Sequence, residues 1–183
     1  MSDLRDYIKF YGIWLDDWET TWGAVTFERF LLREWTENAE SEASSTWIAE
    51  GRSFLYPHHL TKKYFLEGVV EGEISFGATA ASHVSNYEVT VFKINTDTTS
   101  TDLVTTGVIT PTNNTIGALG VITYHFWIDA YNAKELGEYD RIGVRVEWNT
   151  GGAASGATAK LYHDYDATYG YDLWIDLPFI LGE

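Results

Sequence analysis

The acidic and aromatic segment from His163 to Asp172 holds the side chains best suited to binding a metal ion. Its sequence, HDYDATYGYD, places the carboxylates of Asp164, Asp166 and Asp172 around the glycine of a turn. Such hard oxygen ligands around a glycine turn are typical of calcium-binding loops. The segment lacks the spacing of an EF-hand loop and its late bidentate glutamate. We therefore interpret it as an aromatic turn, with calcium as the alternative and no other cofactor expected.

Histidines and paired carboxylates are the other residues that could do chemistry. His58 and His59 are adjacent, and adjacent residues of an extended chain point to opposite faces, which argues against a shared metal ion. His125 lies in a strongly β-forming segment, where a packed or interfacial histidine is expected. Glu71 and Glu147 could form a glycosidase-like pair, which needs a fixed separation and unequal environments. No nucleophile elbow, phosphate-binding loop or zinc motif is present, and the chain has no cysteine, so we predict a non-enzymatic protein that acts by binding.

The composition combines many aromatic side chains with a strongly acidic balance. The 8 Trp and 12 Tyr carry N–H and O–H groups that favour half-buried positions such as interfaces. The formal net charge of −15 repels phosphate backbones and anionic lipids, so neither nucleic acid nor a membrane is expected as a partner. The start MSDLRDYIKF lacks the features of a signal peptide, and no stretch has the apolar length of a membrane span. We expect synthesis in the cytoplasm.

Residues 46–183 are predicted to form an all-β domain. Segments rich in β-branched and aromatic residues alternate there with Gly, Asn, Asp, Ser and Pro, which is typical of an antiparallel β-sandwich of the jelly-roll kind. The expected strands are 46–56, 64–77, 86–95, 103–110, 121–130, 141–149, 157–163 and 172–181.

Alternation within these strands predicts which side chains face the core. It is clearest in 141–149, where apolar residues alternate with polar residues or glycine. The predicted core comprises Phe65, Val69, Val89, Val91, Val121, Phe126, Ile142, Val144, Val146, Leu161 and Leu177.

Residues 1–45 are interpreted as a tryptophan-rich N-terminal arm. Aromatic and apolar residues recur there at helical spacing, so 26–38 could form an amphipathic helix capped by Thr26. The same residue types have high β preference, which favours a strand instead. Both alternatives stay open from the sequence.

Four of the eight tryptophans lie in this arm, at Trp14, Trp18, Trp22 and Trp35. They carry more apolar area than a short acidic segment can bury against itself. We therefore predict that these four residues form an assembly interface. The alternative is that the arm folds back as an extra strand or helix on its own sandwich.

The C-terminal strands carry a resemblance to a known group of proteins. The segments EYDRIGVRVEW at 138–148, ATAKLYHD at 157–164 and DLWIDLPF at 172–179 resemble the last strands of jelly-roll structural proteins encoded by tailed phages and related archaeal viruses. The segments at 64–68 and 87–95 fit the same scheme, and the resemblance covers roughly residues 46–181.

The resemblance implies a virion protein, made in the host cytoplasm, that acts as a capsid decoration, minor capsid or fibre-base component. It also implies other virion proteins as partners, such as the major capsid protein, and a homo-oligomer that is a trimer or higher. Because such sandwiches also hold sugars on exposed Trp and Tyr faces, a carbohydrate- or receptor-binding module is the alternative. A glycan-acting enzyme is a third reading.

Overall fold

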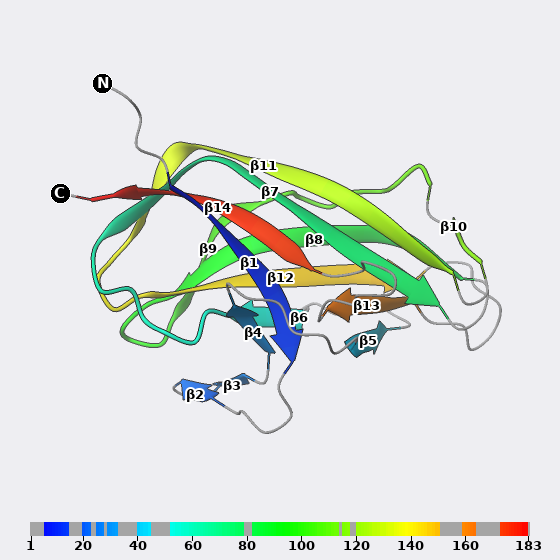
Figure 1. Ribbon diagram of the computed structural model, residues 1–183, viewed down its shortest axis with the longest axis horizontal. Helices are drawn as coiled ribbons and strands as arrows, with labels where there is room; N and C mark the ends of the chain where they lie inside the picture. The colour runs from blue at the N-terminus through cyan, green and yellow to red at the C-terminus, as the bar shows by residue number, and fades with distance from the viewer. Residues whose placement is uncertain are drawn as a thin grey trace.

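The computed structural model describes residues 6–14, 20–22, 25–27, 29–32, 40–44, 52–78, 82–113, 115–117, 120–150, 159–163 and 173–182. These ranges contain fourteen β-strands and no helix. They therefore include no helical candidate for a membrane span. The predicted fold class is confirmed, because the protein is an all-β antiparallel β-sandwich of the jelly-roll type (Figure 1).

The strands are β1 (Asp6–Trp14), β2 (Thr20–Trp22), β3 (Val25–Phe27), β4 (Arg29–Leu32), β5 (Glu40–Ser44), β6 (Arg52–Leu55), β7 (Tyr64–Ala78), β8 (Ser82–Ile94), β9 (Ser100–Thr105), β10 (Thr115–Ile116), β11 (Val121–Leu136), β12 (Arg141–Thr150), β13 (Ala159–His163) and β14 (Trp174–Leu181). The strands predicted after residue 46 are therefore present, with shifted ends. The largest differences are β11, which runs on to Leu136, and residues 106–110, which add only a bridge between Ile109 and Tyr87.

Two layers of strands enclose the core (Figure 1). The front layer consists of β1, β14, β7 and β11 in that order, and the back layer of β6, β12, β8 and β9. Strand β4 joins the layers, because it pairs antiparallel with β1 and parallel with β6. Phe76 of the front layer and Trp148 of the back layer meet between them, with ring centroids 5.7 Å apart.

The core prediction is confirmed at eight of its eleven positions, which are Val89, Val91, Phe126, Ile142, Val144, Val146, Leu161 and Leu177. It is wrong for Phe65 and Val69 of β7, which are half-buried, because Leu66 and Val70 face the core instead. On β7, both the odd-numbered and the even-numbered residues begin as apolar side chains. Only the even-numbered series continues into the core with apolar side chains, through Ile74 and Phe76. Val121, also half-buried, is the first residue of β11.

Strands from the N-terminal segment are part of the sandwich. Strand β1 lies between β14 and β4, and Phe10 is buried in the core. Strand β5 pairs with β13. The helix alternative is wrong for the described part of 26–38, where β3 and β4 form, because β4 exchanges its backbone hydrogen bonds with its sheet neighbours. Residues 33–38 lie outside the described ranges.

Strand β11 contains an irregularity. Ala130 pairs with Gly68 of β7, and the next paired residue, Lys134, pairs with Leu66. Four residue steps on β11 therefore match two on β7. Gly68 has a φ of 132°, a conformation that side chains with a Cβ rarely adopt. This bulge bends the strand near one end of the front layer.

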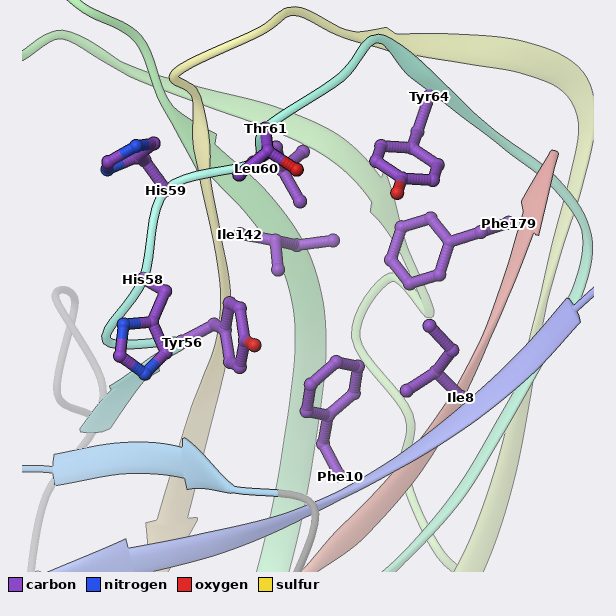
Figure 2. Close-up of a pocket in the computed structure, with 10 residues that line it drawn as sticks. All are labelled: Ile8, Phe10, Tyr56, His58, His59, Leu60, Thr61, Tyr64, Ile142 and Phe179. Atoms are coloured by element: carbon purple, nitrogen blue, oxygen red, sulfur yellow. The ribbon is translucent and has the colours of Figure 1, made fainter. Parts of the chain in front are cut away.

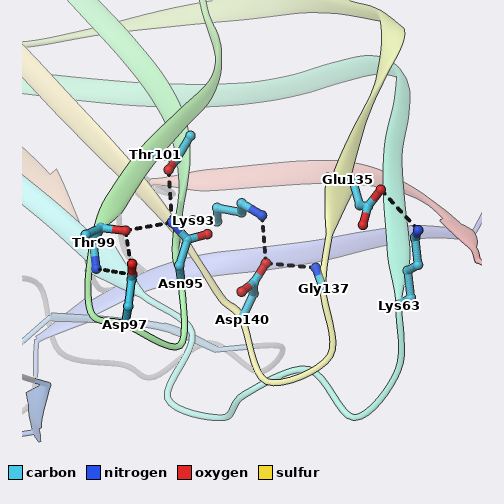
Figure 3. A network of polar contacts seen from close by, with 9 residues as sticks. All are labelled: Lys63, Lys93, Asn95, Asp97, Thr99, Thr101, Glu135, Gly137 and Asp140. Atoms are coloured by element: carbon cyan, nitrogen blue, oxygen red, sulfur yellow. Dashed lines mark hydrogen bonds and ion pairs between the residues drawn. The ribbon is translucent and has the colours of Figure 1, made fainter.

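Side chains close the turns at the end of the sandwich drawn in Figure 3. Asp140 is buried and accepts hydrogen bonds of 2.8 Å from Lys93 Nζ and from the Gly137 N–H. In the turn after β8, Asp97 accepts bonds from the Thr99 N–H and hydroxyl, at 3.0 and 2.6 Å. These bonds lower the pKa of the Asp97 carboxyl.

Candidate functional site

The water-facing side of the front layer carries two rows of side chains that cross its strands. Strand pairing aligns the first row across β1, β14, β7 and β11 as Lys9, Asp176, Glu71 and Trp127. Two residues along each strand, it aligns the second row as Tyr11, Trp174, Glu73 and His125. Directly opposed residues have Cβ atoms about 5 Å apart, so the eight side chains form one continuous surface. We call this surface the two-row patch.

The alternation of the strands explains why these side chains face water. Phe10, Gly72, Phe126 and Ile175 are the inward neighbours of the patch residues, and all four are buried. Gly72 leaves space for Phe126, since a Cβ there would lie only 2.4 Å from the ring atom Cζ. Packing on the inner side therefore fixes the backbone that presents the two-row patch.

Lys9 links the two rows. Its Nζ lies 3.9 Å from Asp176 Oδ2 in its own row and 3.9 Å from the centroid of the Trp174 ring in the next. The cation–π contact holds the ammonium over the indole face. The patch thus contains a positioned cation beside a carboxylate.

Asp176 has an oxygen that the described residues leave without a partner. Its Oδ1 is buried and has no hydrogen bond within the described part of the chain. Burial raises the pKa of the Asp176 carboxyl, the Lys9 ammonium opposes that rise, and the Glu71 carboxylate adds to it. An unpartnered buried acceptor costs free energy, so this carboxylate is held in the patch at some expense of stability.

His125 and Glu73 form the polar end of the second row. His125 Nε2 lies 3.2 Å from Glu73 Oε2, and the His125 side chain is 66% exposed. Of the two expected placements, packed or interfacial, the packed one is wrong, because His125 is on the outer side of β11 while Phe126 takes the core position. The interfacial placement stays a prediction.

Trp127 is the most unusual member of the patch. It is 67% exposed, although an indole is large and mostly apolar, and it stands on a long strand directly opposite Glu71. Tyr131 on the same strand is 68% exposed. A rigid aromatic ring in water beside hydrogen-bonding groups is suited to holding a flat ligand with an apolar face.

The site residues predicted from the sequence lie mostly outside the described structure. This holds for Asp164, Asp166 and Asp172, for Trp18 and Trp35, and for the side chains of Trp14 and Trp22. The calcium alternative and the assembly interface therefore stay predictions. Among the described residues, no group of three or more His, Cys, Asp or Glu side chains could hold a metal ion.

The structure separates the two residue pairs considered for chemistry. Glu71 lies on the outer side of the front layer, and Glu147 lies on the outer side of the back layer, since its neighbours Val146 and Trp148 face the core. Two packed layers therefore stand between the carboxylates. His58 and His59 also diverge, because His58 packs on Tyr56 and His59 packs on Tyr139, with centroids 5.5 Å apart in each case.

Sequence reasoning missed the two-row patch. The signal for Trp127 is present in residues 121–131, where His125, Trp127 and Asp129 alternate with buried apolar residues. The rest of the patch depends on pairing between strands far apart in the chain, which no local pattern contains.

Comparisons with known proteins identify the fold. No family model matches the chain, and no curated protein does. Among solved structures it is similar to an aminopeptidase from the marine sediment archaeon Thaumarchaeota archaeon, with a TM-score of 0.65, 11% identity, and coverage of 96% of this chain and 37% of that chain. A CocE/NonD family hydrolase from Staphylococcus aureus gives a TM-score of 0.64, 10% identity, and coverage of 96% and 36%.

An α-amino acid ester hydrolase gives a TM-score of 0.54 at 10% identity, with coverage of 72% of this chain and 26% of that chain. The chain thus spans well under half the length of all three structures. At these identities the likeness shows the fold alone, which is a β-sandwich that also occurs as part of larger hydrolases.

Proposed function

We propose that the protein is a carbohydrate-binding β-sandwich module and that the two-row patch is its binding surface. The observation that carries the proposal is Trp127, an exposed indole directly opposite the Glu71 carboxylate on a rigid sheet. An indole packs against the C–H face of a sugar ring, and a carboxylate accepts hydrogen bonds from sugar hydroxyls. The patch supplies both kinds of group side by side.

The arrangement of the patch favours an oligosaccharide over a single sugar. Trp127 and Trp174 stand on strands that are two positions apart in the front layer and lie in different rows. Two strand spacings amount to about 10 Å, before the offset between the rows is added. A ligand in contact with both indoles must therefore extend across β7.

Charge favours a ligand without acidic groups. Glu71, Glu73 and Asp176 place three carboxylates in the patch, and Lys9 is the one ammonium among its eight residues. Uronic or sulfated glycans would be repelled over the distance of a Debye length, about 8 Å at physiological salt. We therefore propose neutral glycans as the ligand class.

The same surface argues for binding without turnover. Glycoside hydrolysis needs a general acid and a second carboxylate on opposite sides of the scissile bond, in unequal environments that a cleft provides. The two-row patch is an open outer surface of the sheet, and Glu71 and Trp127 are exposed on it. We propose that this chain contributes recognition without turnover.

Isothermal titration with neutral cello-, xylo-, manno- and malto-oligosaccharides tests the proposal. One of these series should bind, and Trp127→Ala should weaken that binding at least about tenfold, because aromatic anchors dominate such surfaces. Tyr139→Ala is the matched control, since Tyr139 is 54% exposed on the turn after β11, away from the patch. Failure of every series to bind, or equal affinity in Trp127→Ala, would contradict the proposal. Turnover of a bound glycan would contradict its non-enzymatic part.

The virion role implied by the sequence resemblance stays a second proposal. It would use Trp14, Trp18, Trp22 and Trp35 as an assembly interface, with other virion proteins as partners. Light scattering of the full chain decides its oligomeric part, because a monomer at high concentration would contradict a trimer or higher oligomer.

A further inference from the structure

A second site lies at the end of the sandwich, apart from the two-row patch. It is a cavity of about 250 Å³ between β1, β12 and β14 and the segment that joins β6 to β7 (Figure 2). Its inner wall is apolar and consists of Ile8, Phe10, Ile142 and Phe179. We call it the end pocket. Ligand pockets for drug-sized molecules measure about 300–1,000 Å³, so this one suits a compact molecule of one or two rings.

Backbone hydrogen bonds hold the outer wall of the end pocket in place. The Tyr56 N–H donates to the Ile142 carbonyl at 2.9 Å, and the Leu60 N–H donates to the Asp140 carbonyl at 2.8 Å. The Tyr139 N–H donates back to the Leu60 carbonyl at 2.8 Å. The segment after β6 is therefore tied to β12 and to the turn before it, and the pocket exists without a ligand.

Two phenol hydroxyls point into the end pocket from different sides. Figure 2 shows the Tyr56 hydroxyl directed toward the middle of the pocket and the Tyr64 hydroxyl directed toward Phe179. The rings are fixed by edge-to-face packing, with centroids 5.4 Å apart for Phe10 and Tyr56 and 5.8 Å apart for Tyr64 and Phe179. Neither hydroxyl has a hydrogen-bond partner within the part of the chain that the structure describes.

Donors without competing anions surround the opening. His58 and His59 line it as exposed residues, and an imidazole offers at least one N–H donor in either protonation state. Thr61 adds a hydroxyl at the rim. None of the described residues that line the pocket is a carboxylate, although the chain carries 27 Asp and Glu. The lining therefore favours a ligand with an acceptor group over one with a cation.

We propose that the end pocket binds a small aromatic carboxylate, a flat molecule of one or two rings with a carboxylate at its edge. The ring fills the space between Phe10, Ile142 and Phe179, and the carboxylate accepts hydrogen bonds from the phenol and imidazole donors. Hydrogen bonds to a charged acceptor are about twice as strong as neutral ones, which suits two fixed phenol groups without partners. This site is independent of glycan binding by the two-row patch.

The probe is 2-naphthoate, measured by isothermal titration against the full chain, with 2-naphthylmethylamine as a matched cation of similar shape. We expect one naphthoate per chain and weaker or no binding of the amine. The acidic chain attracts the amine non-specifically, so a preference for naphthoate is informative. No naphthoate binding at millimolar concentration, or tighter binding of the amine, would overturn the proposal.

Variants locate the site. Thr61→Trp places an indole at the rim and should abolish naphthoate binding, whereas Thr112→Trp, at an exposed threonine outside the pocket, should not. The double variant Tyr56→Phe, Tyr64→Phe keeps both rings and should weaken binding by roughly tenfold or more, because it removes only the hydroxyl donors. Unchanged affinity in both pocket variants would refute the assignment. Trp127→Ala should leave naphthoate affinity unchanged, which separates this test from that of the glycan site.

Discussion

At the scale of single residues, Asp140 makes two polar contacts from a buried position. Its side chain is 7% exposed and Lys93 is 18% exposed, so the pair in Figure 3 is largely withdrawn from water. Asp140 also holds the Gly137 N–H. We expect Asp140→Ala to lower the free energy of unfolding by about 3–5 kcal/mol, because it leaves a buried ammonium without its partner. Urea unfolding followed by circular dichroism measures the change.

Glu135 supplies the control for that substitution. Its ion pair with Lys63 is 3.0 Å long, but the two side chains are 57% and 40% exposed. Exposed pairs contribute about 0–1 kcal/mol, so Glu135→Ala should have little effect. Equal losses for the two variants would show that burial of the Lys93–Asp140 pair is not what stabilises this end of the sandwich.

Tyr124 makes stability depend on pH in the alkaline range. Burial, with a smaller effect of Tyr87, raises the pKa of Tyr124 to about 12. Its neutral hydroxyl donates to the Asn113 carbonyl at 2.8 Å. In the unfolded chain the phenol ionises near pH 10, so the contribution is complete below that pH and is lost as the pH rises toward 12.

The comparison of wild type with Tyr124→Phe isolates this contribution. The wild type should have the higher Tm at pH 8, and the difference should shrink between pH 10 and about 11.5. In the variant, absorbance at 295 nm should also show one fewer tyrosine that ionises at high pH. A Tm difference that stays constant or grows over this range would contradict the assignment.

At the scale of elements, local patterns predicted most of the strands and one clear core face. Val144 and Val146 are buried as expected, because β12 is apolar on one face only. Strand β7 was assigned the wrong phase at Phe65 and Val69, since both of its faces begin with apolar residues. Which face of β7 is turned to the core depends on Glu71 and Glu73, further along the strand, which lie on its outer side. For residues 26–38 the sequence does not distinguish a helix from a strand, because β4 forms by backbone hydrogen bonds to the neighbouring strands β1 and β6.

Strand β1 provides a test of how the N-terminal segment contributes. It has hydrogen-bonding neighbours on both sides, and Phe10 is only 3% exposed. A chain that begins at residue 15 exposes the edges of β4 and β14 and loses a buried aromatic ring. We expect it to lose cooperative thermal unfolding. A truncated chain that melts like the full one would show that β1 is dispensable.

Two substitutions on β1 refine that test. Phe10→Asp buries a charge without a partner and should cost several kcal/mol, about the upper range for single substitutions. Tyr7→Asp changes a side chain that is 55% exposed on the same strand and should cost little. The same loss for both would mean that strand propensity, and not core packing, decides the result.

At the scale of the whole molecule, the net negative charge lowers the stability of the folded state. The chain has 27 acidic and 12 basic residues, which gives −15. Repulsion among like charges destabilises the compact state and is screened by salt, with a Debye length of about 30 Å at 0.01 M and 10 Å at 0.1 M. We expect Tm to rise between 10 and 300 mM NaCl in differential scanning calorimetry. A fall over this range would mean that attractive pairs such as Lys93–Asp140 outweigh the repulsion.

The candidate site also belongs to this scale, which is why the sequence did not predict it. Lys9, Glu71, Trp127 and Asp176 are separated by tens of residues in the chain and become neighbours only through the order of β1, β14, β7 and β11. The composition indicated that aromatic side chains lie at half-buried positions such as interfaces. It did not indicate which of the tryptophans face water, because that depends on the register of each strand.

The bulge in β11 affects how open the edge of this strand is to pairing with another extended chain. Among the described strands, β11 pairs only with β7, so none of them pairs with its other edge, where an extended chain could add. A regular 16-residue edge would be a good template for fibril growth. The shift between Ala130 and Lys134 breaks that edge into two shorter pieces, and Asp129 and Lys134 place opposite charges beside the break. The irregularity thus shortens the regular stretch of edge on which a second chain could pair in register.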